Sequence, residues 1–192
     1  MRPERPSQLT PRERIVDAAQ ALFMKQGITR VSVDAIAALA ASTKMTVYRH
    51  FENKDALIME WLGRLTKDYG GVFDRLASEH GDSPRQQLLG FVDFIVQDLD
   101  RSGYRGCPFT NTLAELPDAD HPARALIETH KQRQFLRLAT LCRQMELSKP
   151  KQVAEEMTLL MEGAQVVAQN KGIDQVGKRL IRMMRQCLNV AA

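Results

Sequence analysis

The stretch from Val33 to Phe51 constrains the fold more than any other part of this 192-residue chain. In its first half, apolar residues recur at i, i+3, i+4 and i+7, which predicts a short helix with one core-facing stripe. A polar turn at Ala41 to Thr43 follows, after which only Val47 and Phe51 continue an apolar row. The stretch therefore predicts two short helices joined at an angle, and the second exposes most of its surface. The stripe of the first helix consists of Val33, Ile36, Ala37 and Ala40.

Capping residues delimit these helices. Ser32 is a good N-cap for the first helix, Ser42 or Thr43 for the second, and Asn53 for a third that opens at Lys54. Periodicity alone leaves two interpretations open: a helix pair that meets a partner, or a solvated amphipathic pair in an all-helical protein. The closely spaced caps favour short helices joined at angles over one long rod.

An earlier helix is predicted from Thr10 to Gly27. Thr10 is placed as N-cap, Pro11 occupies the first helical position, and Glu13 completes a capping box. Gly27 is typical of a helix end. One face of this helix is apolar, so we expect the helix pair to pack on it. That face carries Ile15, Ala18, Ala19, Leu22 and Phe23.

The run from Arg12 to Leu57 resembles the DNA-binding domain of the TetR family of bacterial transcriptional regulators. Its most specific part is the tail, which reads Tyr-Arg-His-Phe at residues 48–51 and Lys-Asp-Ala-Leu at residues 54–57. The chain departs from the family, whose members usually have glycine at Ala41, an apolar residue at Ser42 and often glycine at Met45. If the turn requires a left-handed residue at Ala41, alanine costs about 1–2 kcal/mol there.

The resemblance implies an all-α fold of about nine helices. Residues 1–53 would form a three-helix helix-turn-helix DNA-binding domain, and residues 54–192 a helical ligand-binding and dimerisation domain. The implied function is that of a cytoplasmic, ligand-responsive regulator, usually a repressor. As a homodimer it would bind a palindromic double-stranded DNA operator and be released by a small-molecule effector. The alternative is an architectural DNA-binding protein on the same scaffold without a ligand.

The second helix of the pair supplies most of the candidate DNA contacts. Lys44, Thr46 and Arg49 carry donors suited to base edges or phosphates, and Met45 is suited to a thymine methyl group. The other candidates suit phosphates, although Tyr48 packing in the core and a solvated Lys54 are the alternatives for those two. The full predicted set is Arg30, Ser32, Lys44, Met45, Thr46, Tyr48, Arg49, His50 and Lys54.

Charge is concentrated in the same region. Residues 1–54 contain nine Lys or Arg and five Asp or Glu, whereas the remaining residues contain 18 of each sign. The whole formal net charge of +4 therefore lies in the segment with the helix pair. A modest excess of this kind supports contact with phosphates.

The sequence offers little for catalysis, and we expect no enzyme activity, cofactor or metal site. It has no GxSxG, no phosphate-binding glycine loop, no CxxC and no HExxH. Asp118, Asp120 and His121 lie close together, but capping of the next helix explains them better than metal binding. Cys107 has two interpretations: a redox or electrophile sensor beside Arg105, or a small apolar residue at a helix break.

Long apolar helices after residue 54 predict a buried core, and the resemblance implies that a small-molecule effector binds among them. The helix expected from Pro84 to about Arg101 has almost no polar face, which indicates a central position. Aromatic residues on this helix and around it, together with Ile95 and Asn111, are candidates for an effector site, with core packing as the alternative for each. The candidates are Trp61, Phe91, Phe94, Ile95, Tyr104, Phe109, Asn111 and Phe135.

The last third of the chain predicts a helical hairpin joined across Gly172. Its apolar residues alternate in steps of three and four, which is typical of helices that pack along a seam. One apolar stripe of the hairpin could close the core of the chain, while the neighbouring stripe contacts a second copy of the protein. The predicted dimer interface comprises Val153, Met157, Leu160, Ala164, Val167, Val176, Leu180, Met183 and Cys187. No apolar run approaches the roughly 20 residues of a membrane span, and the first residues lack the apolar segment of a signal peptide.

Overall fold

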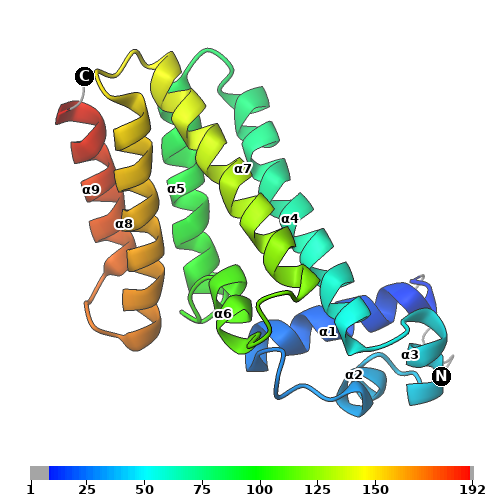
Figure 1. The fold of residues 1–192 in the computed structure, drawn as a ribbon. Coiled ribbons are helices and arrows are strands. Elements are labelled where there is room, and N and C mark those ends of the chain that lie inside the picture. The colour runs from blue at the N-terminus through cyan, green and yellow to red at the C-terminus, as the bar shows by residue number, and fades with distance from the viewer. Residues whose placement is uncertain (1–8, 191–192) are drawn as a thin grey trace, which may run out of the picture. The chain divides into compact units, whose positions relative to one another are not determined.

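The computed structural model describes residues 9–190, and this part of the chain forms nine helices and no strand (Figure 1). The predicted all-α architecture is confirmed. No helix in this range combines the length and apolarity needed to cross a bilayer. Arg2, Glu4 and Arg5, which contribute to the N-terminal charge balance, lie outside the described residues. The helices are α1 (Pro11–Gln26), α2 (Val33–Leu39), α3 (Lys44–His50), α4 (Lys54–Glu79), α5 (Pro84–Arg101), α6 (Pro108–Glu115), α7 (Pro122–Gln144), α8 (Pro150–Asn170) and α9 (Val176–Val190).

Helix starts follow local sequence signals closely. Five helices, α1 and α5 to α8, begin at a proline, whose fixed φ suits the first helical position and whose missing N–H is not needed there. The predicted capping box of Thr10 and Glu13 is present. Ser32, Thr43 and Asn53 also cap as predicted, accepting hydrogen bonds from backbone N–H groups at 3.1, 3.1 and 2.8 Å.

The chain divides between Gly63 and Arg64, inside α4, into two compact units. The boundary predicted after residue 53 assigned all of α4 to the second domain, whereas the first unit includes Lys54–Gly63. Within unit 1, α1 contacts both α2 and α3, and these two helices contact each other. Ile15 of α1 and Ile36 of α2 are fully buried in this core.

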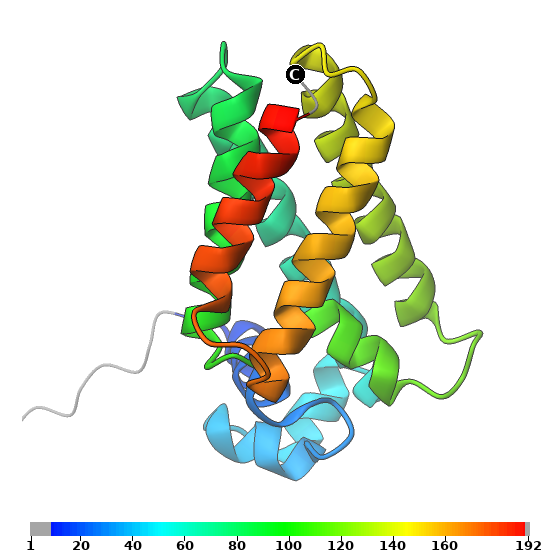
Figure 2. The ribbon, with the colours of Figure 1, turned by 90° about the vertical axis from the view of Figure 1, so that its left-hand side faces the viewer.

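Unit 2 is organised around α5, which contacts α7, α8 and α9. The α8 and α9 helices lie side by side as the predicted hairpin (Figure 2). A Cβ atom on Gly177 of α9 would come within 2.5 Å of Val96 Cγ1 on α5, so glycine permits the close approach of these two helices.

The hairpin turn is longer than the sequence periodicity predicts. The sequence predicts a hairpin joined across Gly172, but α9 begins only at Val176. Lys171 has a left-handed backbone with φ of 56°, which ends α8, and Ile173 is 49% exposed. Apolar spacing alone does not reveal where a backbone leaves the helical conformation.

Candidate functional site

The α3 helix presents a largely unpacked surface. Its one buried residue is Val47, which is 2% exposed and anchors the helix in unit 1. Met45 is 83% exposed and Tyr48 is 47% exposed. Lys44 and Arg49 are exposed as well. We call Lys44, Met45, Tyr48 and Arg49 the α3 face; the fold of unit 1 leaves these side chains free to contact another molecule.

The turn before α3 has a left-handed residue at Ala41, the conformation in which alanine carries a cost. Ala41 has φ of 47°, in the left-handed region. The turn is held on both sides, because Ser42 N–H donates to the Ala37 carbonyl at 2.9 Å and Arg14 Nε donates to the Ala40 carbonyl at 3.1 Å. An alanine in this conformation costs about 1–2 kcal/mol, and the contacts to α1 and α2 offset that cost.

An ion pair joins the α3 face to α2. Lys44 Nζ lies 2.8 Å from Asp34 Oδ2, and both side chains are mostly exposed. The hydrogen bond to Asp34 and its negative charge raise the pKa of Lys44. Lys44 therefore remains charged, but one of its donors is already directed to α2. Any phosphate or base that binds Lys44 competes with Asp34.

The remaining predicted DNA contacts also lie in unit 1. Arg30 is exposed, and Ser32 uses its hydroxyl oxygen to cap α2. Thr46 Oγ1 lies 2.9 Å from the hydroxyl of the α3 cap. His50 is half-buried, with a buried Nε2 that has no partner, and Lys54 is half-buried at the start of α4. Ser32, Thr46 and His50 thus take part in the fold, in addition to any contact with a ligand.

Arg12 supports the base of α3, a role that the sequence patterns did not indicate. Its guanidinium forms two hydrogen bonds to Glu60, at 3.1 and 2.8 Å, and lies 5.1 Å from the centre of the Phe51 ring. The hydrogen bond to Glu60 raises the pKa of Arg12. The pair connects α1 to the first part of α4 beside the residue that ends α3.

The structure does not gather all of the predicted effector-site residues. Trp61 is 1% exposed and packs on Phe23 in unit 1, with ring centres 5.3 Å apart. The others belong to unit 2, where Tyr104 is exposed at 48%. Of the remaining six, three are buried in the core and three are half-buried. The buried residues are Phe91, Ile95 and Phe109; the half-buried ones are Phe94, Asn111 and Phe135.

Aromatic rings from four helices meet in the core of unit 2. Tyr69 contacts Phe94 and Phe109 edge-on, with ring centres 5.0 and 5.2 Å apart, and Phe109 stacks on His130 at 4.2 Å. We call Tyr69, Phe94, Phe109 and His130 the aromatic cluster. Tyr69 donates a 2.5 Å hydrogen bond to Asp98. Burial, together with the charge of Asp98, raises the pKa of Tyr69, which stays protonated.

His130 is the unusual member of the aromatic cluster. It is 8% exposed, and its buried Nε2 has no hydrogen-bond partner. Burial and the positive charges of Lys131 and Arg133 lower the pKa of His130 to about 4. His130 is therefore neutral near pH 7 and packs mainly as an aromatic ring.

Cys107 lies beside a charged side chain. The residue is 5% exposed, and its Sγ accepts a hydrogen bond from Lys131 Nζ at 3.3 Å. Lys131 also pairs with Glu162 of α8, which accepts a hydrogen bond from Thr110 at 3.1 Å. Burial alone would lower the pKa of Lys131, but Cys107 and Glu162 raise it overall. We call Cys107, Thr110, Lys131 and Glu162 the polar cluster.

The sequence patterns singled out Cys107 but not Thr110, Lys131 or Glu162 of the polar cluster, and they missed the buried polar residues of α7. The available signal was a polar residue on an apolar stripe: His130 and Gln134 continue the row from Ile127 to Leu138 on α7, and both are buried. The pairing of Lys131 with Glu162 spans 31 residues of sequence and left no local signal.

Residues of the predicted dimer interface divide into two groups. Val153, Met157 and Leu180 are at most 5% exposed and close the chain's own core. Met183 is exposed at 38%, and the other members are half-buried: Leu160, Ala164, Val167, Val176 and Cys187. The most exposed apolar residues of α8 lie beside this seam, at Leu159 (74%) and Val166 (50%).

Comparisons with known proteins agree with this architecture. The family model for bacterial regulatory proteins of the tetR family matches residues 15–60, which span α1 to the first part of α4. The HTH-type transcriptional regulator YjdC of Escherichia coli is 24% identical over 79% of this chain and 80% of its own length. The transcriptional repressor KstR of Mycolicibacterium smegmatis is 33% identical over 53% of this chain and 48% of its own length.

A solved structure extends the likeness to nearly the whole chain. SCO4454, a TetR-family transcriptional regulator from Streptomyces coelicolor, superposes with a TM-score of 0.86 and 26% identity. The match covers 94% of this chain and 95% of that one. With the helix-turn-helix of α2 and α3 and the helical unit that follows, the chain belongs to the TetR family of bacterial transcriptional regulators.

Proposed function

We propose that the protein is a homodimeric repressor that binds a palindromic operator through α3 and releases it when a small molecule binds unit 2. The observation that carries the proposal is the α3 face. Its four side chains carry donors or a long apolar tip and are exposed, whereas Val47 is the buried residue of α3. A helix of this kind fits the major groove, where base edges are read.

Different members of the α3 face suit different parts of DNA. Arg49 and Lys44 can donate to guanine O6 and N7 or to phosphates, and Met45 can contact a thymine methyl group. Tyr48 is suited to a phosphate oxygen. Two α3 faces of a dimer would meet half-sites about 34 Å apart, one turn of B-DNA.

Exposed apolar residues beside the α8–α9 seam support dimerisation. Leu159 and Val166 of α8 are 74% and 50% exposed, and Met183 of α9 is 38% exposed. We expect Leu159→Glu to convert the dimer to monomers in analytical ultracentrifugation. Leu136→Glu is the matched control, because Leu136 is a 60% exposed leucine on α7. A dimer that survives Leu159→Glu would place the interface elsewhere.

The effector acts by linkage. A compound that binds better to a conformation with mis-spaced α3 faces releases DNA only in proportion to its differential affinity for the two conformations. Phe91, Phe94, Phe109, Asn111 and Phe135 remain candidates for its contacts. Because the rings of Phe91, Phe94 and Phe109 pack against other rings of unit 2, an effector there must separate them, which would couple binding to a change of shape.

The decisive experiment is capture of sheared genomic DNA by the purified protein at near-physiological salt, followed by sequencing. One palindrome enriched at a few promoters is expected, and Arg49→Ala should abolish the enrichment. Arg133→Ala on α7 is the control, since it removes an exposed arginine from unit 2. Binding at very many sites without a shared palindrome would instead support the architectural alternative.

A second candidate function, electrophile sensing, rests on the polar cluster. Reactive cysteines typically lie beside a cationic side chain, and Lys131 Nζ is 3.3 Å from Cys107 Sγ. In the reaction, sulfur would form a bond to the β-carbon of an α,β-unsaturated carbonyl compound, and the proton lost by the thiol would end on the α-carbon. The test is DNA release by N-ethylmaleimide. Release that persists in Cys107→Ser would exclude this role.

A further inference from the structure

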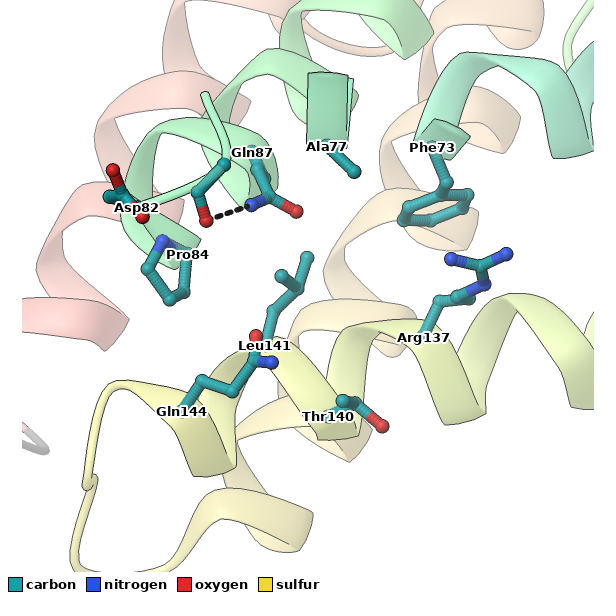
Figure 3. Close-up of a pocket in the computed structure, with 10 residues that line it drawn as sticks. Phe73, Ala77, Asp82, Pro84, Gln87, Arg137, Thr140, Leu141 and Gln144 are labelled. Carbon is teal, nitrogen blue, oxygen red and sulfur yellow. Dashed lines mark hydrogen bonds between the residues drawn. The ribbon is translucent and has the colours of Figure 1, made fainter. Parts of the chain in front are cut away.

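A groove of about 500 Å³ opens in unit 2 between α4, α5 and α7 (Figure 3). Its volume lies within the range of roughly 300–1,000 Å³ that is typical of small-molecule sites. We call it the α4–α7 groove. Its lining comprises Phe73 and Ala77 of α4, Gly81 and Asp82 of the α4–α5 turn, Pro84 and Gln87 of α5, and Arg137, Thr140, Leu141 and Gln144 of α7. Asp82 lies at the end of the groove away from Arg137 (Figure 3). None of these residues was among the predicted effector contacts.

Gln87 provides a fixed acceptor on one side of the groove. Its side chain is 8% exposed, and Nε2 donates to the carbonyl oxygens of His80 and Gly81 at 3.0 and 3.3 Å. Nε2 therefore holds the α4–α5 turn, which fixes the orientation of the amide. Figure 3 shows the amide oxygen Oε1 turned toward the space between Ala77 and Leu141. A ligand hydroxyl or N–H can donate to this oxygen.

Arg137 provides a cation on another side of the groove. It forms a 2.9 Å ion pair with Asp74, whose side chain is 69% exposed, while that of Arg137 is 56% exposed. Exposed pairs contribute little to stability, because water solvates both partners when they separate. A ligand carboxylate can therefore replace Asp74, and a guanidinium binds a carboxylate through two parallel hydrogen bonds.

Apolar surface lies between these two polar groups. Phe73 projects from α4 and Leu141 from α7 toward one another across the groove (Figure 3). The Phe73 ring is held in place by stacking on Phe91, with ring centres 4.1 Å apart and planes inclined by 20°. A planar ring of a ligand can pack against this supported surface.

We propose that the α4–α7 groove binds a hydroxyaryl carboxylate. The carboxylate pairs with Arg137, the ring packs between Phe73 and Leu141, and the hydroxyl donates to Gln87 Oε1. Each part of the ligand thus matches one part of the groove. The site stands on the geometry of unit 2 alone and does not depend on whether the protein releases DNA.

The test uses isothermal titration calorimetry of the full-length protein with para-hydroxyphenylacetate and 3-(para-hydroxyphenyl)propanoate. One saturable site per chain is expected for at least one of them. Two analogues probe the polar groups: para-hydroxyphenylacetamide lacks the charge, and para-methoxyphenylacetate lacks the donor. We expect each change to weaken binding about tenfold or more, as charge-assisted and buried hydrogen bonds do.

Protein variants locate the site. Arg137→Gln should weaken binding of the carboxylates about tenfold and leave the amide unchanged. Arg133→Gln is the matched control on the same helix, outside the groove, and should have no effect. Ala77→Trp, at an exposed position on the groove wall, should abolish binding while the circular dichroism spectrum and melting temperature stay unchanged.

Three results would overturn the proposal. The first is that neither carboxylate binds saturably. The second is binding that survives Ala77→Trp, which would place the compound elsewhere. The third is an equal loss in Arg137→Gln and Arg133→Gln, which would indicate general attraction of an anion rather than a defined contact.

Discussion

The α3 face and the aromatic cluster differ in what the fold requires of their side chains. Met45 and Tyr48 of the α3 face are 83% and 47% exposed, whereas Phe109 and His130 of the aromatic cluster are 0% and 8% exposed. A side chain with few internal contacts can be replaced at little cost in folding free energy. The difference implies that changes in α3 alter binding first, and changes in the cluster alter stability first.

The largest expected effect tests this contrast directly. Phe109→Ala should lower the free energy of unfolding by about 3–5 kcal/mol, because it removes a buried ring that contacts Tyr69 and His130. Tyr48→Ala should lower it by less than about 1 kcal/mol, since nearly half of the Tyr48 side chain is exposed. Urea denaturation of both variants provides the measurement. Equal losses would show that Tyr48 belongs to the core of unit 1.

A second prediction concerns pH and the aromatic cluster. His130 has a pKa of about 4 in the folded chain, below the ordinary value near 6.5. Between these values the unfolded chain binds a proton that the folded chain does not, so stability falls as pH drops from about 6.5 to 4. The contribution is on the order of 3 kcal/mol.

Replacement of His130 isolates this contribution from that of the carboxyl groups. His130→Phe keeps the stacking on Phe109 but cannot bind a proton. We expect the stability difference between the variant and the native protein to move in favour of the variant as pH falls from 7.5 to 4.5. Urea denaturation at both pH values measures it. A difference that does not change with pH would mean that His130 is protonated as readily in the folded chain as in the unfolded one.

The two units also differ in how far the sequence predicted them. In unit 1 the caps at Thr10, Ser32, Thr43 and Asn53 were predicted because each signal involves residues within three positions of one another. The α3 face follows from the same local pattern, since a short helix with one anchor must expose the rest of its surface. Its binding roles remain predictions.

Unit 2 was less predictable, because its chemistry depends on residues that are distant in sequence. Apolar periodicity predicted the α5 helix and the α8–α9 hairpin. The contacts of Lys131 with Glu162 and of Tyr69 with Asp98 span 31 and 29 residues. Periodicity identifies the face that a residue occupies but not its partner on another helix. For the same reason, the residues of the α4–α7 groove drew no attention in the sequence.

The turn before α3 offers a smaller test within unit 1. Ala41→Gly should raise the free energy of unfolding by about 0.5–1 kcal/mol, because glycine relieves the left-handed strain at φ of 47° but loses more entropy on folding. Ala38→Gly is the matched control: Ala38 is an exposed residue of α2, where glycine should destabilise by about 1 kcal/mol. Thermal denaturation distinguishes the two. The same sign for both variants would contradict the strain at Ala41.

The smallest expected change in stability, and the clearest separation of binding from folding, comes from Asp34→Asn. This variant removes the negative charge that pairs with Lys44, yet exposed ion pairs contribute little to stability. The free energy of unfolding should change by less than about 0.5 kcal/mol.

DNA affinity should rise up to about fivefold at low salt, because the freed ammonium meets phosphates without a competing carboxylate. Asp93→Asn, an exposed change on α5 in unit 2, controls for net charge in the same fluorescence anisotropy titration. Weaker binding by Asp34→Asn would reverse the interpretation: the ion pair would then position Lys44 for DNA, and the α3 face would depend on α2 for its geometry.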